Sequence, residues 1–140
     1  MTEIVLSAEA RFTAGILLLS IVAVESGGLY MLRIVTRCQP ASGFQISFSR
    51  AGHAHAGVLV VFGLVCQLYA DASGLSQPLA SIARSGVPLA AILMPAGFFF
   101  SSAGAGRTEP NRFIWLVYAG AVSLTVGVIT LGIGVLTGPG

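Results

Sequence analysis

The chain has 140 residues, of which 55% are hydrophobic and only 9% are charged, whereas an ordinary soluble domain carries about a quarter charged residues. This composition excludes an ordinary soluble protein and fits one membrane domain that covers residues 1–140. The net charge of +2 comes without a basic stripe interleaved with aromatic residues, so nucleic acid is not expected as a partner.

Four segments have the roughly 20 mostly apolar residues that a membrane-spanning helix needs. The segments between them collect Pro, Gly, Ser and charged residues, which is typical of loops. We therefore expect an all-α, polytopic membrane protein in contact with the lipid bilayer. Its transmembrane helices are predicted at about 12–32, 51–70, 84–104 and 113–137.

The arginines near the predicted helix ends indicate an orientation, because positive residues in short loops stay on the cytoplasmic side. The first and third connections hold five arginines: Arg33, Arg37, Arg50, Arg107 and Arg112. The N-terminal segment and the second connection hold two, Arg11 and Arg84. We expect a multi-pass protein of the cell (inner, cytoplasmic) membrane with both termini outside.

Small residues recur in the last predicted helix, where Gly120, Gly127 and Gly134 are spaced seven apart and mark one stripe. Glycines let helix backbones approach in lipid, where packing must supply the association. Contacts within one chain and contacts between copies of the chain both fit this stripe. Pro88 and Pro95 lie within the third helix, where they would bend it or free carbonyl groups for a neighbour.

Three ionisable side chains fall inside the predicted spans: Glu25, His53 and His55. Such residues cost free energy in lipid, by about 2.5 kcal/mol or more for Asp, Lys or Arg at the centre of a span, so a functional role is expected by default. The three positions lie in the same third of the bilayer if the helices are straight. Glu25 is a candidate for one of three roles. It could hydrogen-bond to a metal-binding residue and so orient it, it could relay protons, or it could simply hydrogen-bond to a histidine of the next helix.

The stretch RAGHAHAG holds both histidines of the chain. Residues two apart on a helix are rotated by about 200°, so His53 and His55 face nearly opposite sides and cannot clamp one ion. Small residues flank both rings and leave room for a flat group, and a neutral imidazole in such a place is a good ligand for haem iron. The alternative is that each ring only hydrogen-bonds a neighbouring helix. Arg50 is an interfacial anchor or a partner for a haem propionate.

The segment AGHAHAGVLVVFG resembles the His-x-His helix of the haem-copper oxygen and nitric-oxide reductases, and RAGH resembles the Arg-x-x-His of another haem-ligating helix in that family. The resemblance implies that His53 and His55 are haem or metal ligands. The family is built as three four-helix arcs with the ligands on the second helix of each arc, so it also implies a threefold homo-oligomer. The chain lacks the further histidines of the family's copper site. It is also similar to small four-helix membrane proteins with an Arg-Ala-Gly-His-Ala-His segment, a likeness that implies no activity.

These observations predict a membrane protein that binds b-type haem through His53 and/or His55, with a redox, electron-transfer or gas-binding role. The alternative is a non-enzymatic accessory or transport subunit. Its histidines would bind copper or zinc, or would be purely structural. Hydrolase chemistry is not expected, because the chain has neither G-x-S-x-G nor H-E-x-x-H.

Overall fold

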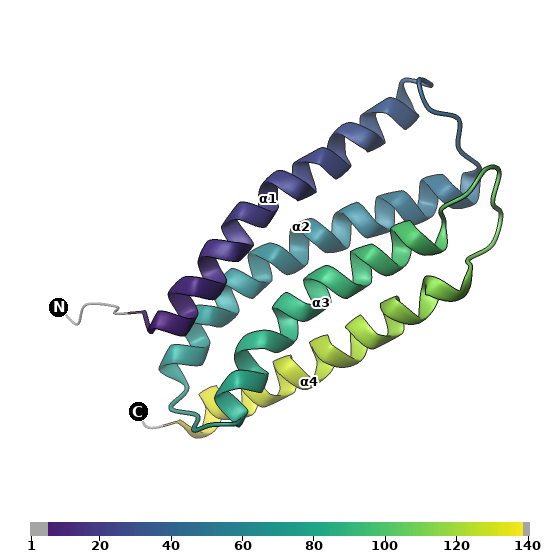
Figure 1. Cartoon of the computed structure of the whole chain (residues 1–140). Helices are drawn as coiled ribbons and strands as arrows, with labels where there is room; N and C mark the ends of the chain where they lie inside the picture. Colours follow the sequence, from purple (N-terminus) through teal and green to yellow (C-terminus); the bar gives the residue numbers. More distant parts are fainter. Residues whose placement is uncertain (1–5, 139–140) are drawn as a thin grey trace.

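A computed structural model of the chain describes residues 6–138. Within these residues the protein is all-helical, and four helices are long and apolar enough to cross a membrane, as the sequence predicts. They lie side by side (Figure 1). The elements are α1 (Ala8–Val35), α2 (Gly43–Ala72), α3 (Leu79–Ser101), the short 3-10 helix η1 (Arg112–Ile114) and α4 (Trp115–Thr137).

The bundle has two distinct ends. The connections 36–42 and 102–111 lie at one end, which we call the two-loop end. The start of α1, the connection 73–78 and the end of α4 lie at the other end, which we call the termini end (Figure 1).

The second helix begins eight residues earlier than the apolar pattern predicts, at Gly43 instead of residue 51. The reason is a capping box: the Ser42 side chain accepts from the backbone of Gln45, and the Gln45 side chain accepts from the backbone of Ser42. At about 1.5 Å per residue, His53 lies about 15 Å from the start of α2. Arg50 is thus part of the helix and does not mark its boundary. The third helix is also shifted, to Leu79–Ser101 from the predicted 84–104.

α3 is the centre of the bundle, because it packs against both α2 and α4. Its contact with α4 is a backbone contact: a Cβ atom placed on Gly86 would lie 2.5 Å from the Cα atom of Gly127. Of the other two glycines in the α4 stripe, Gly120 faces Met94 of α3, and Gly134 faces the side chain of Leu75 in the connection 73–78. The stripe therefore serves packing within one chain.

The prolines of α3 leave carbonyl groups without their usual helical donors, and another helix supplies one. Pro88 has no N–H for the carbonyl of Arg84, and the amide of the buried Gln67 donates to that carbonyl over 2.9 Å. Ser123 of α4 donates to the carbonyl of Gly86 over 2.9 Å. These bonds join α2 and α4 to α3 where lipid offers no hydrogen bond.

α1 is the most loosely attached helix, since it packs chiefly against α2 and makes few contacts with α3. At the termini end it is held by polar contacts: Asp71 accepts from the backbone and the hydroxyl of Ser7, both over 2.8 Å, and from Arg84 over 2.8 Å. Toward the two-loop end, α1 diverges from α2 (Figure 1).

The glycine contact between α3 and α4 gives a first prediction. A Cβ atom placed on Gly127 would lie 2.7 Å from the Cα atom of Gly86, so we expect Gly127→Leu to lower the unfolding free energy by at least about 1–3 kcal/mol. Gly132→Leu is the matched control on the same helix, because nothing lies within 4 Å of a Cβ there. Thermal unfolding in detergent, followed by circular dichroism, measures both. Equal midpoints would contradict the packing described.

Candidate functional site

His53 lies on the face of α2 that meets α1. A Cβ atom placed on Gly27 would lie 3.3 Å from Nδ1 of His53, and one placed on Gly28 would lie 3.4 Å from its Cε1. The two glycines thus make room for the imidazole between the helices. The ring is half-buried, and within residues 6–138 neither of its nitrogens has a hydrogen-bond partner. Its Nε2 also faces α1, 3.6 Å from a Cβ atom placed on Gly28, so both ring nitrogens lie at this helix interface.

His55 has different surroundings. Its Nδ1 lies 2.8 Å from the carbonyl oxygen of Ala51, one turn earlier on α2. In the neutral ring Nδ1–H donates to this carbonyl, which leaves the lone pair on Nε2. The ring packs on Phe98 of α3, with the centroids 5.0 Å apart. The two histidines thus meet different helices, as the rotation between positions two apart predicts.

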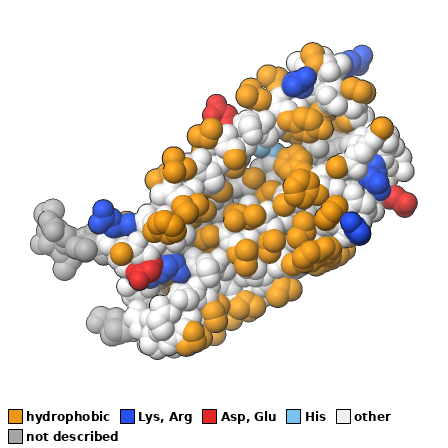
Figure 2. All heavy atoms as spheres, in the orientation of Figure 1, with side chains coloured by type: hydrophobic (Ala, Val, Ile, Leu, Met, Phe, Trp, Pro, Cys, Tyr) orange, Lys and Arg blue, Asp and Glu red, His pale blue; other side chains and the backbone are white. Residues whose placement is uncertain are grey.

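An apolar groove of about 370 Å³ runs between α1, α2 and α3 beside His53. We call it the lateral groove. Its walls include Phe12 and Ile16 of α1 and Pro88 and Pro95 of α3, with His53 among the few polar groups. Figure 2 shows histidine atoms in the hollow between apolar side chains on this side of the molecule.

A second hollow borders His53 on the outer face of α2. It is a shallow depression of about 780 Å³, and its other residues are small or apolar: Ala54, Gly57, Val58, Val61, Phe62 and Val65. Ala54 and Gly57 keep this face flat beside the ring. His53 is the residue shared by the depression and the lateral groove.

Glu25 makes no hydrogen bond or ion pair with either histidine within residues 6–138, so no contact in this part of the chain supports the alternative in which a histidine bonds to this carboxylate. Glu25 is exposed on α1. Gly27 and Gly28 are the α1 residues that meet His53, and Glu25 lies about 200° around the helix from Gly27. Arg50 is exposed as well. The only ion pair among residues 6–138 joins Arg84 and Asp71.

The described residues of one chain contain no group of three His, Cys, Asp or Glu side chains that could hold a metal ion. A complete multidentate metal site within one chain is therefore not found among them. A cofactor such as a metal-centred flat ring needs fewer protein ligands than a free metal ion does. It requires one or two ring nitrogens, an apolar surface and a cationic side chain. His53 and the two hollows supply the first two, and Arg50 lies one turn before His53 on α2.

Sequence reasoning misses a polar chamber at the two-loop end. It is bounded by the connections 36–42 and 102–106, the end of α1 and the first turns of α2, and Ser49 and Phe99 line it. The apolar pattern assigns residues 43–50 to a loop, so it does not predict that they pair with α3. The Ser42-x-x-Gln45 capping box is the available signal, because it marks the start of a helix.

Comparisons with known protein families, with curated proteins and with solved structures give no match for this chain. The likeness to the haem-copper reductases thus rests on the segment around His53 and His55 alone.

Proposed function

We propose that the protein is a haem-binding, multi-pass membrane protein with a redox, electron-transfer or gas-binding role. One observation carries the proposal: His53 has no hydrogen-bond partner within residues 6–138 and borders two apolar hollows. An imidazole that is shielded from water without a polar partner costs free energy, and a metal–nitrogen bond would offset that cost.

The residues around His53 suit a b-type haem. Its ring nitrogen would bind the iron, and the flat surface at Ala54 and Gly57 would lie against the porphyrin. Arg50 is exposed one turn away and would pair with a propionate. Bound haem would supply one-electron exchange or a site for a diatomic gas.

A copper or zinc site is the second candidate, and the hydrogen bond of His55 favours it. Metal-binding histidines commonly donate their second N–H to a backbone carbonyl, as Nδ1 of His55 does to Ala51. One chain supplies too few ligands among its described residues. Copies of His55 from several chains around an axis would supply more.

We further propose a homo-oligomer, with a trimer favoured by the resemblance. Glu25 supports it, because this carboxylate is exposed within α1, about 15 Å from the last residue of the helix. A charge that faces lipid at this depth costs about 2.5 kcal/mol or more. A second copy that covers this face of α1 would lower the cost.

The arginines support an orientation with the two-loop end in the cytoplasm and both termini outside the cell membrane. Arg50 is the eighth residue of α2 and lies farther from a helix end than the other six arginines, so we leave it out of the count. The two-loop end then has four arginines and the termini end two: Arg33, Arg37, Arg107 and Arg112 against Arg11 and Arg84.

The haem proposal predicts a Soret absorption band in protein purified after expression with haem supplied. His53→Ala should remove most of this absorption, and added imidazole should restore part of it by filling the vacated space. His55→Ala is the matched variant, two residues away, and should keep the band with a shift at most. A colourless wild-type protein, or an unchanged band in His53→Ala, would overturn the proposal. Metal analysis of the same samples tests for copper or zinc.

The oligomer proposal predicts that Glu25 contributes to association. Glu25→Leu removes the carboxylate that a neighbour would cover, so we expect the association constant in mild detergent to fall on the order of tenfold, about 1.4 kcal/mol. Light scattering coupled to size exclusion measures the mass across a dilution series. Glu109→Leu, in the connection 102–111, is the control. A monomeric wild type, or equal effects of the two substitutions, would count against the proposal.

The orientation is tested with the chain's own thiols. Cys38 is exposed in the connection 36–42, and Cys66 is buried in α2. In right-side-out membrane vesicles, a membrane-impermeant maleimide should label Cys38 only after the vesicles are permeabilised. Cys38→Ser should abolish the labelling, which excludes Cys66 as its source. Labelling of Cys38 in intact vesicles would reverse the proposed orientation.

A further inference from the structure

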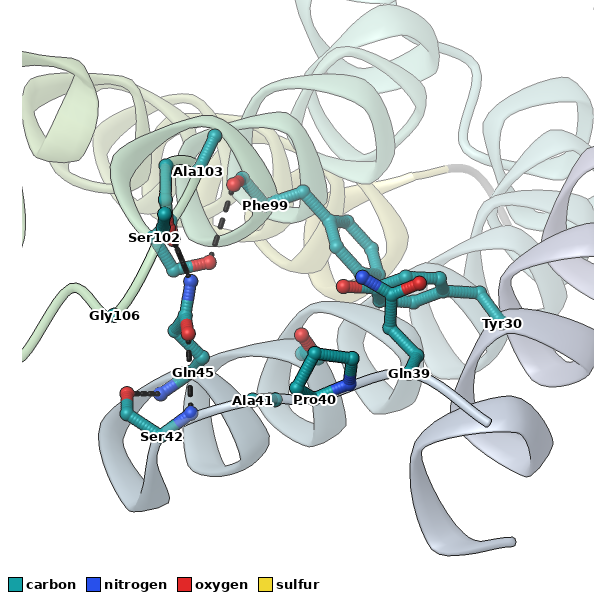
Figure 3. A pocket seen from close by; sticks show the side chains of 13 residues that line it. Tyr30, Gln39, Pro40, Ala41, Ser42, Gln45, Phe99, Ser102, Ala103 and Gly106 are labelled. Carbon is teal, nitrogen blue, oxygen red and sulfur yellow. Dashed lines mark hydrogen bonds between the residues drawn. The ribbon is translucent and has the colours of Figure 1, made fainter. Parts of the chain in front are cut away.

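The polar chamber at the two-loop end has a volume of about 710 Å³. Two of its polar residues are already committed to the fold. Ser42 and Gln45 form the capping box of α2, and the Gln45 amide donates to the carbonyls of Ser102 over 3.0 Å and Gly104 over 2.7 Å (Figure 3). These bonds hold the connection 102–111 against the start of α2 and keep the chamber in shape.

Three other polar side chains of the chamber have no hydrogen-bond partner within residues 6–138. Ser49 is the strongest indication of a missing partner, because the residue is only 3% exposed and a buried hydroxyl normally has a hydrogen-bond partner. Helical serines commonly donate to a carbonyl one turn earlier, as the nearby Ser47 does to Gly43 over 3.0 Å. Ser49 has no such bond. The hydroxyl of Tyr30 and the amide of Gln39 also line the chamber without partners in this part of the chain.

Aromatic rings line the same space. The side chains of Tyr30, Gln39 and Phe99 point toward one another across the chamber (Figure 3). Phe99 packs against α2 at Gly52, where a Cβ atom would lie 3.0 Å from the phenyl ring. Flat groups stack well on such rings.

Phe99 also lines the lateral groove, so the polar chamber and the apolar groove meet at this residue. One stripe of α2 passes along both. Ser49 lines the chamber, and His53, Ala56 and Val60 line the groove at the three- and four-residue spacing of one helix face. The chamber and the groove are thus neighbours along α2, with the chamber between the loops and the apolar groove further inside the bundle.

The residues that line the chamber include no Arg, Lys, Asp or Glu among those described. A phosphate headgroup would need a cation, so an anionic phospholipid suits the chamber poorly. A neutral ring with oxygen substituents suits it well, because Ser49, Tyr30 and Gln39 each offer a hydrogen-bond donor.

We propose that the chamber and the lateral groove together bind a prenylated quinone or quinol. Its ring lies in the chamber between Tyr30 and Phe99, and its oxygen atoms bond to Ser49, Tyr30 or Gln39. Its isoprenoid chain follows the groove past His53 toward Phe12. This binding goes beyond the proposed function and does not depend on haem.

Photoaffinity labelling tests the proposal. The full chain in phosphatidylcholine nanodiscs is mixed with an azido-quinone that carries a two-unit isoprenoid chain, and labelled peptides are mapped by mass spectrometry. We expect saturable labelling of chamber residues, which an unlabelled quinone competes away. A monoacylglycerol of similar length and phosphatidylglycerol should compete on the order of tenfold more weakly, because neither has a flat ring to stack on the aromatic side chains. Equal competition by either lipid, or labelling that does not saturate, would overturn the proposal.

Two pairs of variants locate the ring. Ser49→Ala and Tyr30→Phe each remove one hydrogen bond, so each should weaken quinone binding about five- to tenfold. Ser47→Ala on the same helix and Tyr118→Phe on the exposed face of α4 are their controls and should leave binding unchanged. Equal effects within each pair would contradict the assigned positions.

A third variant fills the chamber from a connection and leaves every helix residue unchanged. Ala41→Trp, in the connection 36–42, should abolish saturable labelling while the circular dichroism spectrum stays that of the wild type. Undiminished labelling in this variant would contradict the assigned chamber. Labelling is repeated in Gly57→Trp, which fills the depression on the outer face of α2 but lines neither the chamber nor the groove, so this variant should lose haem and still bind the quinone. If such a variant loses haem and keeps quinone labelling, the two sites are separate. The haem proposal and the quinone proposal can then fail independently of each other.

Discussion

The close backbone approach of α3 to its neighbours is the constraint on which the rest of the structure depends. Lipid gives helices no hydrophobic reason to associate, so contact area and hydrogen bonds must hold them. Gly86 and Gly127 bring α3 and α4 into backbone contact, and Gln67 and Ser123 bond to carbonyls of α3. α1 takes no part in these contacts and packs chiefly on α2, so the lateral groove lies beside it.

Glycine has opposite effects on the two sides of the molecule. Between α3 and α4, the backbone of the neighbouring helix occupies the space that a side chain would fill. At Gly27 and Gly28 of α1, the imidazole of His53 occupies this space. At Gly57, nothing lies within 4 Å of a Cβ position, and the outer face of α2 stays open. Small residues therefore tighten one half of the bundle, while in the other half they accommodate the imidazole of His53 and leave the outer face of α2 open.

The sequence predicts the four helices because apolar length is a strong and local signal. It predicts the different surroundings of His53 and His55 because helical rotation is also local. The start of α2 is harder to predict, because residues 43–50 are polar and charged like a loop, while one pair of capping bonds at Ser42 makes them helical. The surroundings of Glu25 are also hard to predict, because its depth places it near the histidines while its rotation about α1 turns it away from His53. The chamber depends on contacts between residues far apart in the chain, which a single sequence does not reveal.

The rotation that separates Glu25 from His53 also sorts the polar groups of the membrane region into two kinds. Groups that face the interior, such as Gln67 and Ser123, find carbonyls freed or left accessible in α3. Glu25 and Arg50 face outward and have no ion-pair partner within the described chain. Charged side chains in lipid are costly, so the exposure of Glu25 supports the proposed oligomer. His53 stands between the two kinds, because it is half-buried and borders both hollows, and this placement is what supports the proposed ligand role.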